Sequence, residues 1–173
     1  MSEIRRLNEE EALSAIPALS AVLADCVEDG ASVGFMYPLA EGEAEAFWRG
    51  VATNVARGEV ALLVAEHDGE IVGTVQMGLT AKPNQPHRGD VMKLLVHRKA
   101  RGLGLSKKLM AAAEVEAKAH GRWLLVLDTA TGELAEGIYE RLGWTQSGII
   151  PNYALYPDGR YCATTLFFKD LRE

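Results

Sequence analysis

Two glycines follow an arginine in a short turn between an apolar segment and a helical pattern. The run reads Arg101-Gly102-Leu103-Gly104-Leu105-Ser106. Apolar residues before it predict a strand over Val91–Val96, and apolar residues after it recur at helical spacing. The first turn of a helix has amide groups without partners inside the helix, and the helix dipole adds partial positive charge there. This order of strand, turn and helix can therefore bind a phosphate or pyrophosphate.

The glycines also have a plainer explanation. Gly102 and Gly104 lack a Cβ and let an anion approach the backbone, but they would equally close a tight connection between strand and helix. Arg101 would add a full positive charge. Neither the dinucleotide fingerprint G-x-G-x-x-G nor the P-loop motif is present. The turn alone leaves both an anion site and a structural connection open.

Two aspartates beside the predicted strands are candidates for acid–base chemistry. Asp128 follows a buried apolar run, and Asp90 stands at the start of the strand before the glycine turn. A carboxylate in either place can orient an ammonium group or accept its proton through water, because an alkyl amine with a pKa of about 10 is mostly charged at neutral pH. The alternatives are that Asp128 caps the following helix and that Asp90 is a solvated turn residue.

An apolar segment near the N-terminal end lacks clear periodicity. It extends from Gly30 to Pro38 and contains Val33, Phe35 and Met36. A loop of this kind either fills part of the core or lines a ligand site. Its residue types alone favour the core.

Composition limits the class of protein. The chain has 173 residues, 48% of them apolar and 24% charged, with a net charge of −6. Length and composition predict one soluble domain over residues 1–173. The negative charge argues against a nucleic-acid partner, whose binding protein would be basic, and suits a small amine-bearing substrate better.

The cysteines and histidines give no metal-binding pattern. Cys26 and Cys162 are isolated, and the four histidines share no ligand spacing with them, so no metal site is expected. The N-terminus has no apolar signal region, and no stretch approaches the ~18 apolar residues of a membrane span. We therefore expect a cytoplasmic protein with reduced thiols and no membrane partner.

The elements that must position these residues follow from apolar periodicity and turn signals. Asn8 is predicted to cap the first helix, Pro17 should kink or divide this helix, and the pair Asp68-Gly69 predicts a hairpin. A turn-rich piece covers Ala81–Gly89.

The predicted strands are Glu3–Leu7, Val60–Glu66, Ile71–Leu79, Val91–Val96, Trp123–Leu127, Gln146–Tyr153 and Tyr161–Lys169. The predicted helices are Asn8–Gly30, Ala44–Val55, Leu105–His120 and Gly132–Leu142. The result is a mixed α/β fold with a parallel strand, helix, strand crossover at its centre.

Two of these runs resemble motifs of a known family. Arg101–Ser106 is similar to the [QR]-x-x-G-x-[GA] signature of the GNAT superfamily of N-acetyltransferases, with Ser106 at a position where the family has Gly or Ala. Ile138–Trp144 resembles the family's Φ-Y-E-x-x-G-F segment. Residues 30–36 and 157–160 are most similar to the tabtoxin-resistance type. The resemblance implies the GNAT fold, a mostly antiparallel mixed sheet of about seven strands with a central parallel splay, flanked by four helices.

The resemblance also implies a coenzyme, acetyl-CoA, used as co-substrate. Its pyrophosphate would lie on the glycine turn, contacted by Arg101, Gly102, Leu103, Gly104, Leu105 and Ser106. Its pantetheine arm would pair like an extra strand with Leu94, Leu95 and Val96, where two strands splay apart. A backbone amide there would polarise the thioester carbonyl.

Tyr139 matches the tyrosine that the family uses as general acid for the leaving thiolate, although a tyrosine that only packs its ring remains the alternative. The resemblance supports Asp128 and Asp90 as acids on the acceptor side, with a water relay at Asp90 because the subfamily commonly has a longer Glu there. It also implies that Ser32, Phe35 and Met36 wall the acceptor site.

We therefore expect direct acetyl transfer to the amine of a small molecule that is amino-acid-like, or antibiotic- or toxin-like as in resistance enzymes. The alternatives are a non-catalytic acyl-CoA-binding or regulatory module and a protein N-acetyltransferase. Apolar side chains of the last two predicted strands leave a homodimer open.

Overall fold

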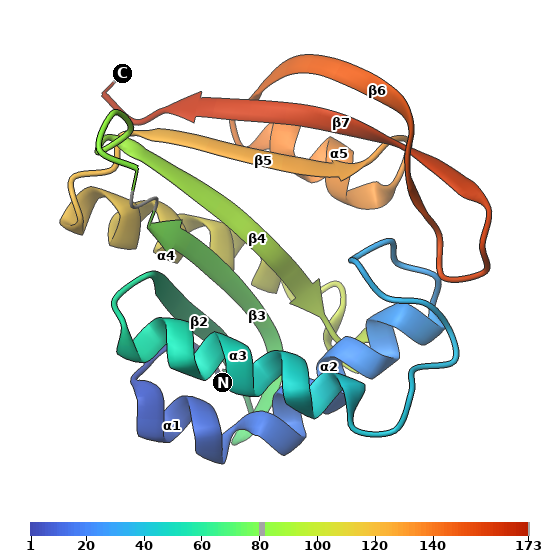
Figure 1. Cartoon of the computed structure of the whole chain (residues 1–173). Helices are drawn as coiled ribbons and strands as arrows, with labels where there is room; N and C mark the ends of the chain where they lie inside the picture. The colour runs from blue at the N-terminus through green and yellow to red at the C-terminus, as the bar shows by residue number, and fades with distance from the viewer. Residues whose placement is uncertain (80–81, 173) are drawn as a thin grey trace.

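Seven strands form one sheet in a computed structural model that describes residues 1–79 and 82–172 (Figure 1). Their order across the sheet is β1-β2-β3-β4-β5-β7-β6. The strands are β1 (Ser2–Leu7), β2 (Val60–His67), β3 (Glu70–Leu79), β4 (Arg88–Val96), β5 (Leu124–Ala130), β6 (Thr145–Leu155) and β7 (Tyr161–Asp170). The helices are α1 (Glu9–Ser14), α2 (Ile16–Glu28), α3 (Glu43–Ala56), α4 (Leu105–Ala119), α5 (Leu134–Arg141) and the 3₁₀ turn η1 (Arg98–Ala100). The predicted mixed α/β fold and its seven strands are confirmed.

The first predicted helix is divided, so the described residues hold five α-helices rather than four. Asn8 caps α1, since its side chain accepts from the Glu11 amide at 2.9 Å and the Glu11 carboxylate accepts from the Asn8 amide at 2.9 Å. Pro17 stands in the first turn of α2, where its missing N–H leaves no hydrogen bond unmade. The proline therefore starts a second helix, one of the two outcomes predicted for it.

Two strands are longer than predicted, which changes the place of both aspartates. β4 starts at Arg88 because its first residues pair with β5, and β5 extends to Ala130 because its last residues pair with β7. Asp90 and Asp128 therefore lie inside strands. The N-cap position of α5 is Glu133, whose side chain makes no capping hydrogen bond, so the interpretation of Asp128 as a helix cap is wrong. The predicted turn before β4 begins at Ala81, which lies outside the described residues.

Helices cover the two faces of the sheet unequally. Figure 1 shows α1, α2 and α3 on one face of the sheet and α4 and α5 on the other. Each face has its own core, since alternate strand residues point to opposite faces. Leu62 and Val64 pack with Trp48 on the α1–α3 face, whereas Val75 and Leu125 pack on the α4–α5 face. Over β5, β7 and β6, none of the described residues forms a helix on the face opposite α5 (Figure 1).

The centre of the sheet opens where β4 and β5 separate. They pair in parallel over three positions only, from Arg88↔Leu124 to Asp90↔Val126, and then diverge (Figure 1). The pairing of β4 with β3 shifts register between Met92 and Leu95, so β4 contains one extra residue. Lys93 lies in this bulge with φ +51°. Bulges bend a strand, and this one accompanies the divergence of β4 from β5. The predicted central splay is confirmed.

Candidate active site at the strand splay

The glycine turn after β4 leads directly into α4. Gly102 and Gly104 have φ values of +80° and +71°, and nothing lies within 4 Å of a Cβ placed on either. The turn therefore requires glycine for its left-handed backbone, not for tight packing. Among the described residues, no side chain caps α4, whose N-cap is Gly104. Its first amide groups are available to an anion.

Acidic residues of α2 and its C-cap hold the arginines of this turn. Arg101 Nη1 lies 2.6 Å from Asp29 Oδ2, and Arg98 Nε lies 2.8 Å from Asp25 Oδ1. The Arg98 amide also donates to Asp25 at 2.8 Å. Burial of the Asp25 carboxyl would raise its pKa, but the hydrogen bonds from Arg98 outweigh burial and lower the pKa. These contacts fasten the turn to α2, and the charge of Arg101 is already engaged.

Tyr139 belongs to the core on the α4–α5 face. Its side chain is 6% exposed, and its ring centroid lies 6.1 Å from that of Trp144 and 5.8 Å from that of Phe167. Burial raises the pKa of its hydroxyl, and the negative charge of Asp128 raises it further. Tyr139 is therefore a neutral phenol throughout the physiological range, close enough to Asp128 to sense its charge.

Asp90 and Asp128 lie on the same face of the sheet. The neighbouring residues Val91 and Leu127 point into the α4–α5 core, so the two carboxylates point away from it. Asp90 occupies the last paired position, opposite Val126, and its Oδ2 lies 3.4 Å from Arg88 Nη2. Asp128 is exposed two residues further along β5 and accepts a hydrogen bond from Thr164 Oγ1 at 3.0 Å. Both carboxylates therefore lie where β4 and β5 begin to separate, a place that we call the mouth of the splay.

The segment between α2 and α3 crosses toward the end of the β6–β7 hairpin (Figure 1). Ser32 Oγ donates to the Leu155 carbonyl at 2.8 Å, and the Tyr37 amide donates to the Pro157 carbonyl at 3.1 Å. Phe35 packs edge-on against Phe47 with 5.2 Å between ring centroids, whereas Met36 is exposed. Phe35 therefore contributes to the core, and the rest of the loop forms a bridge beside the splay.

Sequence reasoning missed Lys93, whose charge lies on the same side of the splay. Its Nζ lies 5.7 Å from the centroid of the Phe47 ring and 3.7 Å from a Cβ placed on Gly34. Burial lowers its pKa, and Asp128 opposes that shift. A signal was present, because a lysine interrupts the otherwise apolar end of a predicted buried strand.

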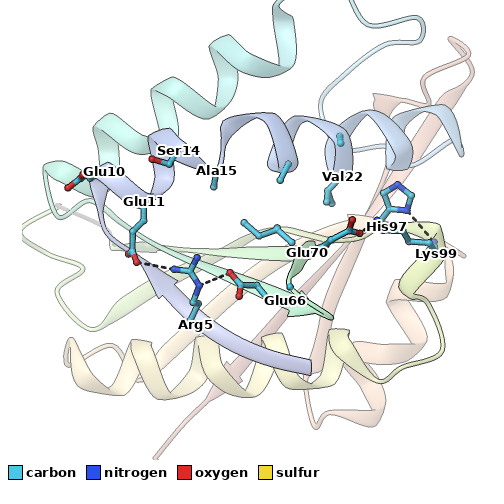
Figure 2. A pocket seen from close by; sticks show the side chains of 14 residues that line it. Arg5, Glu10, Glu11, Ser14, Ala15, Val22, Glu66, Glu70, His97 and Lys99 are labelled. Atoms are coloured by element: carbon cyan, nitrogen blue, oxygen red, sulfur yellow. Dashed lines mark hydrogen bonds and ion pairs between the residues drawn. The ribbon is translucent and has the colours of Figure 1, made fainter. Parts of the chain in front are cut away.

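A separate groove of about 640 Å³ lies between the first two helices and the β2–β3 hairpin. Figure 2 shows Arg5 there between Glu11 and Glu66. Arg5 Nη1 lies 3.0 Å from Glu11 Oε1, and Arg5 Nε lies 2.7 Å from Glu66 Oε1. None of the residues predicted for the site lines this groove. Its ion pairs join β1, α1 and β2, so they tie these three elements together along the groove.

Further features limit other chemistries within the described residues. No group of three or more His, Cys, Asp or Glu side chains in residues 1–79 and 82–172 could hold a metal ion. Cys26 and Cys162 are buried and form no disulfide. Of the helices in the described part of the chain, none has the length and apolar character to cross a membrane.

Comparison with known families identifies the family to which this chain belongs. The family model described as an acetyltransferase (GNAT) domain matches residues 58–146, just over half of the chain. This stretch contains β2 to α5 and therefore the splay, the glycine turn and Tyr139. The chain belongs to the GNAT acetyltransferase family.

Individual relatives agree with the family. An uncharacterized N-acetyltransferase from the hisH-hisA intergenic region of Azospirillum brasilense is 35% identical over 106 residues. That match covers 60% of this GNAT chain and 61% of the relative, so it spans less than two thirds of the relative's length.

Solved structures share the fold along nearly the whole chain. An N-acetyltransferase from Staphylococcus aureus Mu50 superposes with a TM-score of 0.81 at 22% identity, covering 99% of both chains. A candidate acetyltransferase from Salmonella typhimurium, solved with its cofactor acetyl-CoA, superposes with a TM-score of 0.79 at 19% identity. That comparison covers 100% of this chain and 95% of the other.

Proposed function

We propose that this GNAT chain is an acetyl-CoA-dependent N-acetyltransferase that acetylates the amine of a small, amino-acid-like or toxin-like molecule by direct transfer. One observation carries the proposal: β4 and β5 part after three paired positions, beside Asp90 and Asp128, and β4 leads through the glycine turn into α4, whose first amide groups are capped by no side chain of the described residues. The Salmonella structure named above, which has the same fold, holds acetyl-CoA.

The residues around the splay fit this coenzyme. The amides at the start of α4 and the Arg101 guanidinium suit a pyrophosphate, with Leu103, Leu105 and Ser106 lining the turn. Leu94, Leu95 and Val96 lie beyond the last position at which β4 pairs with β5, so their strand edge can pair with an extended amide-bearing arm. Bound acetyl-CoA supplies the acetyl group as a thioester.

Side chains of this protein orient the amine, remove its proton and stabilise the leaving sulfur. Asp128 orients the acceptor ammonium at the mouth of the splay, and Asp90 takes its proton through water. Tyr139 donates a hydrogen bond to the leaving sulfur. Its pKa lies above the value of about 8.5 for a thiol, so full proton transfer to the thiolate is uphill and the hydrogen bond itself stabilises the thiolate.

The bridge from the α2–α3 segment to the β6–β7 hairpin favours a small acceptor. Ser32 and Tyr37 tie the bridge down through backbone carbonyls, which narrows the space in which a polypeptide would have to lie. Met36 remains on its surface, where it can contact a small molecule at the rim.

The test is calorimetric titration of the protein with acetyl-CoA, followed by thiol-release assays with a panel of small amines. We expect micromolar binding and acetyl-CoA-dependent thiol release with at least one amine. Absence of acetyl-CoA binding would overturn the proposal. Binding without turnover on any amine would favour the non-catalytic alternative.

A further inference from the structure

Of the lysines in the described residues, Lys93 and Lys169 are partly buried, and their charges are balanced differently. Lys169 Nζ lies 2.7 Å from Glu114 Oε1 and 2.8 Å from the Leu142 carbonyl, so its charge is paired within the fold. Among the described residues, no carboxylate oxygen lies within 4.0 Å of Lys93 Nζ. Removing an ammonium from water without a close counter-ion is unfavourable, so a purely structural lysine would be expected to resemble Lys169.

The backbone directs the Lys93 side chain toward the splay through an unfavourable conformation. Lys93 has φ +51°, a left-handed conformation that residues with side chains seldom adopt, within the bulge of β4. Bulges beside active sites re-aim a side chain, and strained backbone is retained where the surrounding structure enforces it. Here the bulge places the ammonium beside the Phe47 ring, on the sheet face that carries the two aspartates.

The groups closest to the Lys93 ammonium leave its charge unneutralised. Gly34 passes close to the ammonium, with 3.7 Å between Lys93 Nζ and a Cβ placed on Gly34. Phe47 contributes the negatively polarised face of its ring, which attracts the cation without neutralising it. The pairing of β4 with β5 ends at Asp90↔Val126, so Asp128, two residues beyond Val126, lies across the splay from Lys93. The Asp128 charge opposes the lowering of the Lys93 pKa. One positive and one negative group therefore face the same space.

Two opposite charges across an opening match a zwitterion. We propose that Lys93 binds the carboxylate of an amino-acid acceptor while Asp128 holds its ammonium group, an inference that rests on the proposed function. The substrate class is therefore free amino acids or close analogues, and Lys93 determines the preference for the acid over neutral amines.

The experiment compares matched acceptors. Thiol release is measured with L-amino acids and with the carboxamide of each, using the unaltered protein, Lys93→Met and Lys93→Arg. We expect the unaltered protein to prefer the acids. Lys93→Met should raise KM for the acids about 10- to 100-fold, the range expected for losing a charge-assisted contact, while kcat changes less than threefold. Lys93→Arg should restore part of the preference.

Controls separate binding from folding and from the proposed function. Lys118→Met removes the same charge from the exposed end of α4 and should leave the kinetics unchanged. Acetyl-CoA affinity, measured by calorimetry, should be equal in all variants. A preference for acids that persists in Lys93→Met overturns the inference, as does a loss of kcat with unchanged KM. Turnover of neutral amines alone overturns it while the proposed function stands, whereas absent acetyl-CoA binding refutes the proposed function itself.

Discussion

Two regions beside the splay hold their cations differently. In the glycine turn, which we propose as the coenzyme side, acidic residues of α2 and its C-cap pair with Arg98 and Arg101, and Asp29 lies 2.6 Å from Arg101. In the bulge of β4, which we propose as the acceptor side, Lys93 lies beside the Phe47 ring, and among the described residues no carboxylate oxygen lies within 4.0 Å of its Nζ. A paired cation fixes a loop, whereas a cation without a close counter-ion keeps its attraction for a ligand. Charge alone therefore does not reveal which cation binds substrate.

The coenzyme side gives the largest expected effect. The double variant Arg101→Glu, Gly104→Pro places a negative charge at the turn and forces a proline where the backbone has φ +71°. We expect calorimetric binding of acetyl-CoA to weaken at least about 100-fold, since charge repulsion and a distorted turn act together. Arg101→Glu alone tests the charge without the strain that Gly104→Pro adds, in case the double variant misfolds. Lys118→Glu on α4 is the control for charge reversal. If both variants that carry Arg101→Glu bind acetyl-CoA with unchanged affinity, the pyrophosphate does not bind at this turn.

Tyr139 belongs to the α4–α5 core and to neither cation site, so loss of its hydroxyl should affect turnover without changing either binding step. Tyr139→Phe keeps the packing against Trp144 and Phe167 and removes only the hydroxyl. We expect kcat in the thiol-release assay to fall about 10- to 1000-fold, because the leaving thiolate loses the hydrogen bond that stabilises it, with acetyl-CoA affinity retained. Unchanged turnover would mean that the tyrosine only packs its ring.

Sequence reasoning found the elements better than their contacts. Apolar alternation and the turn at Asp68-Gly69 are local signals, and they predicted the β2–β3 hairpin that the structure contains. The ends of β4 and β5 were misplaced because Arg88 and Asp128 are polar residues that join strands through hydrogen bonds to neighbours far away in the sequence. Local periodicity carries no information about such partners.

The same reason explains which site residues were found. Tyr139 and the glycine turn lie in short motifs, so a family resemblance was enough to select them. Lys93 depends on a register shift against β3, which only the assembled sheet reveals. The pair of Arg101 with Asp29 joins residues from the ends of two separate elements, and neither residue type predicts the other.

The coenzyme-side pairs should also contribute to stability. Asp25→Asn removes a buried carboxylate that accepts from both the Arg98 amide and its side chain. We expect the free energy of unfolding in urea at pH 7 to fall by about 1–2 kcal/mol, a moderate value because Arg98 is 44% exposed. The folded-state pKa of Asp25 is lowered, so its contribution is complete above the unfolded value near 3.8 and is lost as pH falls through the folded pKa. The difference between the two proteins should therefore shrink below pH 3.8, and a constant difference would assign the effect to packing.

The smallest effect tests whether pairing on the coenzyme side restrains the ligand contact. Asp29→Asn keeps the size of the side chain and removes the charge that engages Arg101. Both partners are more than one third exposed, so the pair contributes only about 0.2–1 kcal/mol, equivalent to at most about a fivefold change in affinity. If Asp29 competes with the coenzyme for Arg101, the variant should bind acetyl-CoA up to about fivefold more tightly in calorimetry at low salt, and added salt should reduce the difference because it screens exposed charges. Weaker binding would instead mean that Asp29 orients Arg101 toward the pyrophosphate. Arg101 would then be positioned for its ligand by a paired carboxylate, whereas Lys93 would be positioned by the backbone bulge of β4.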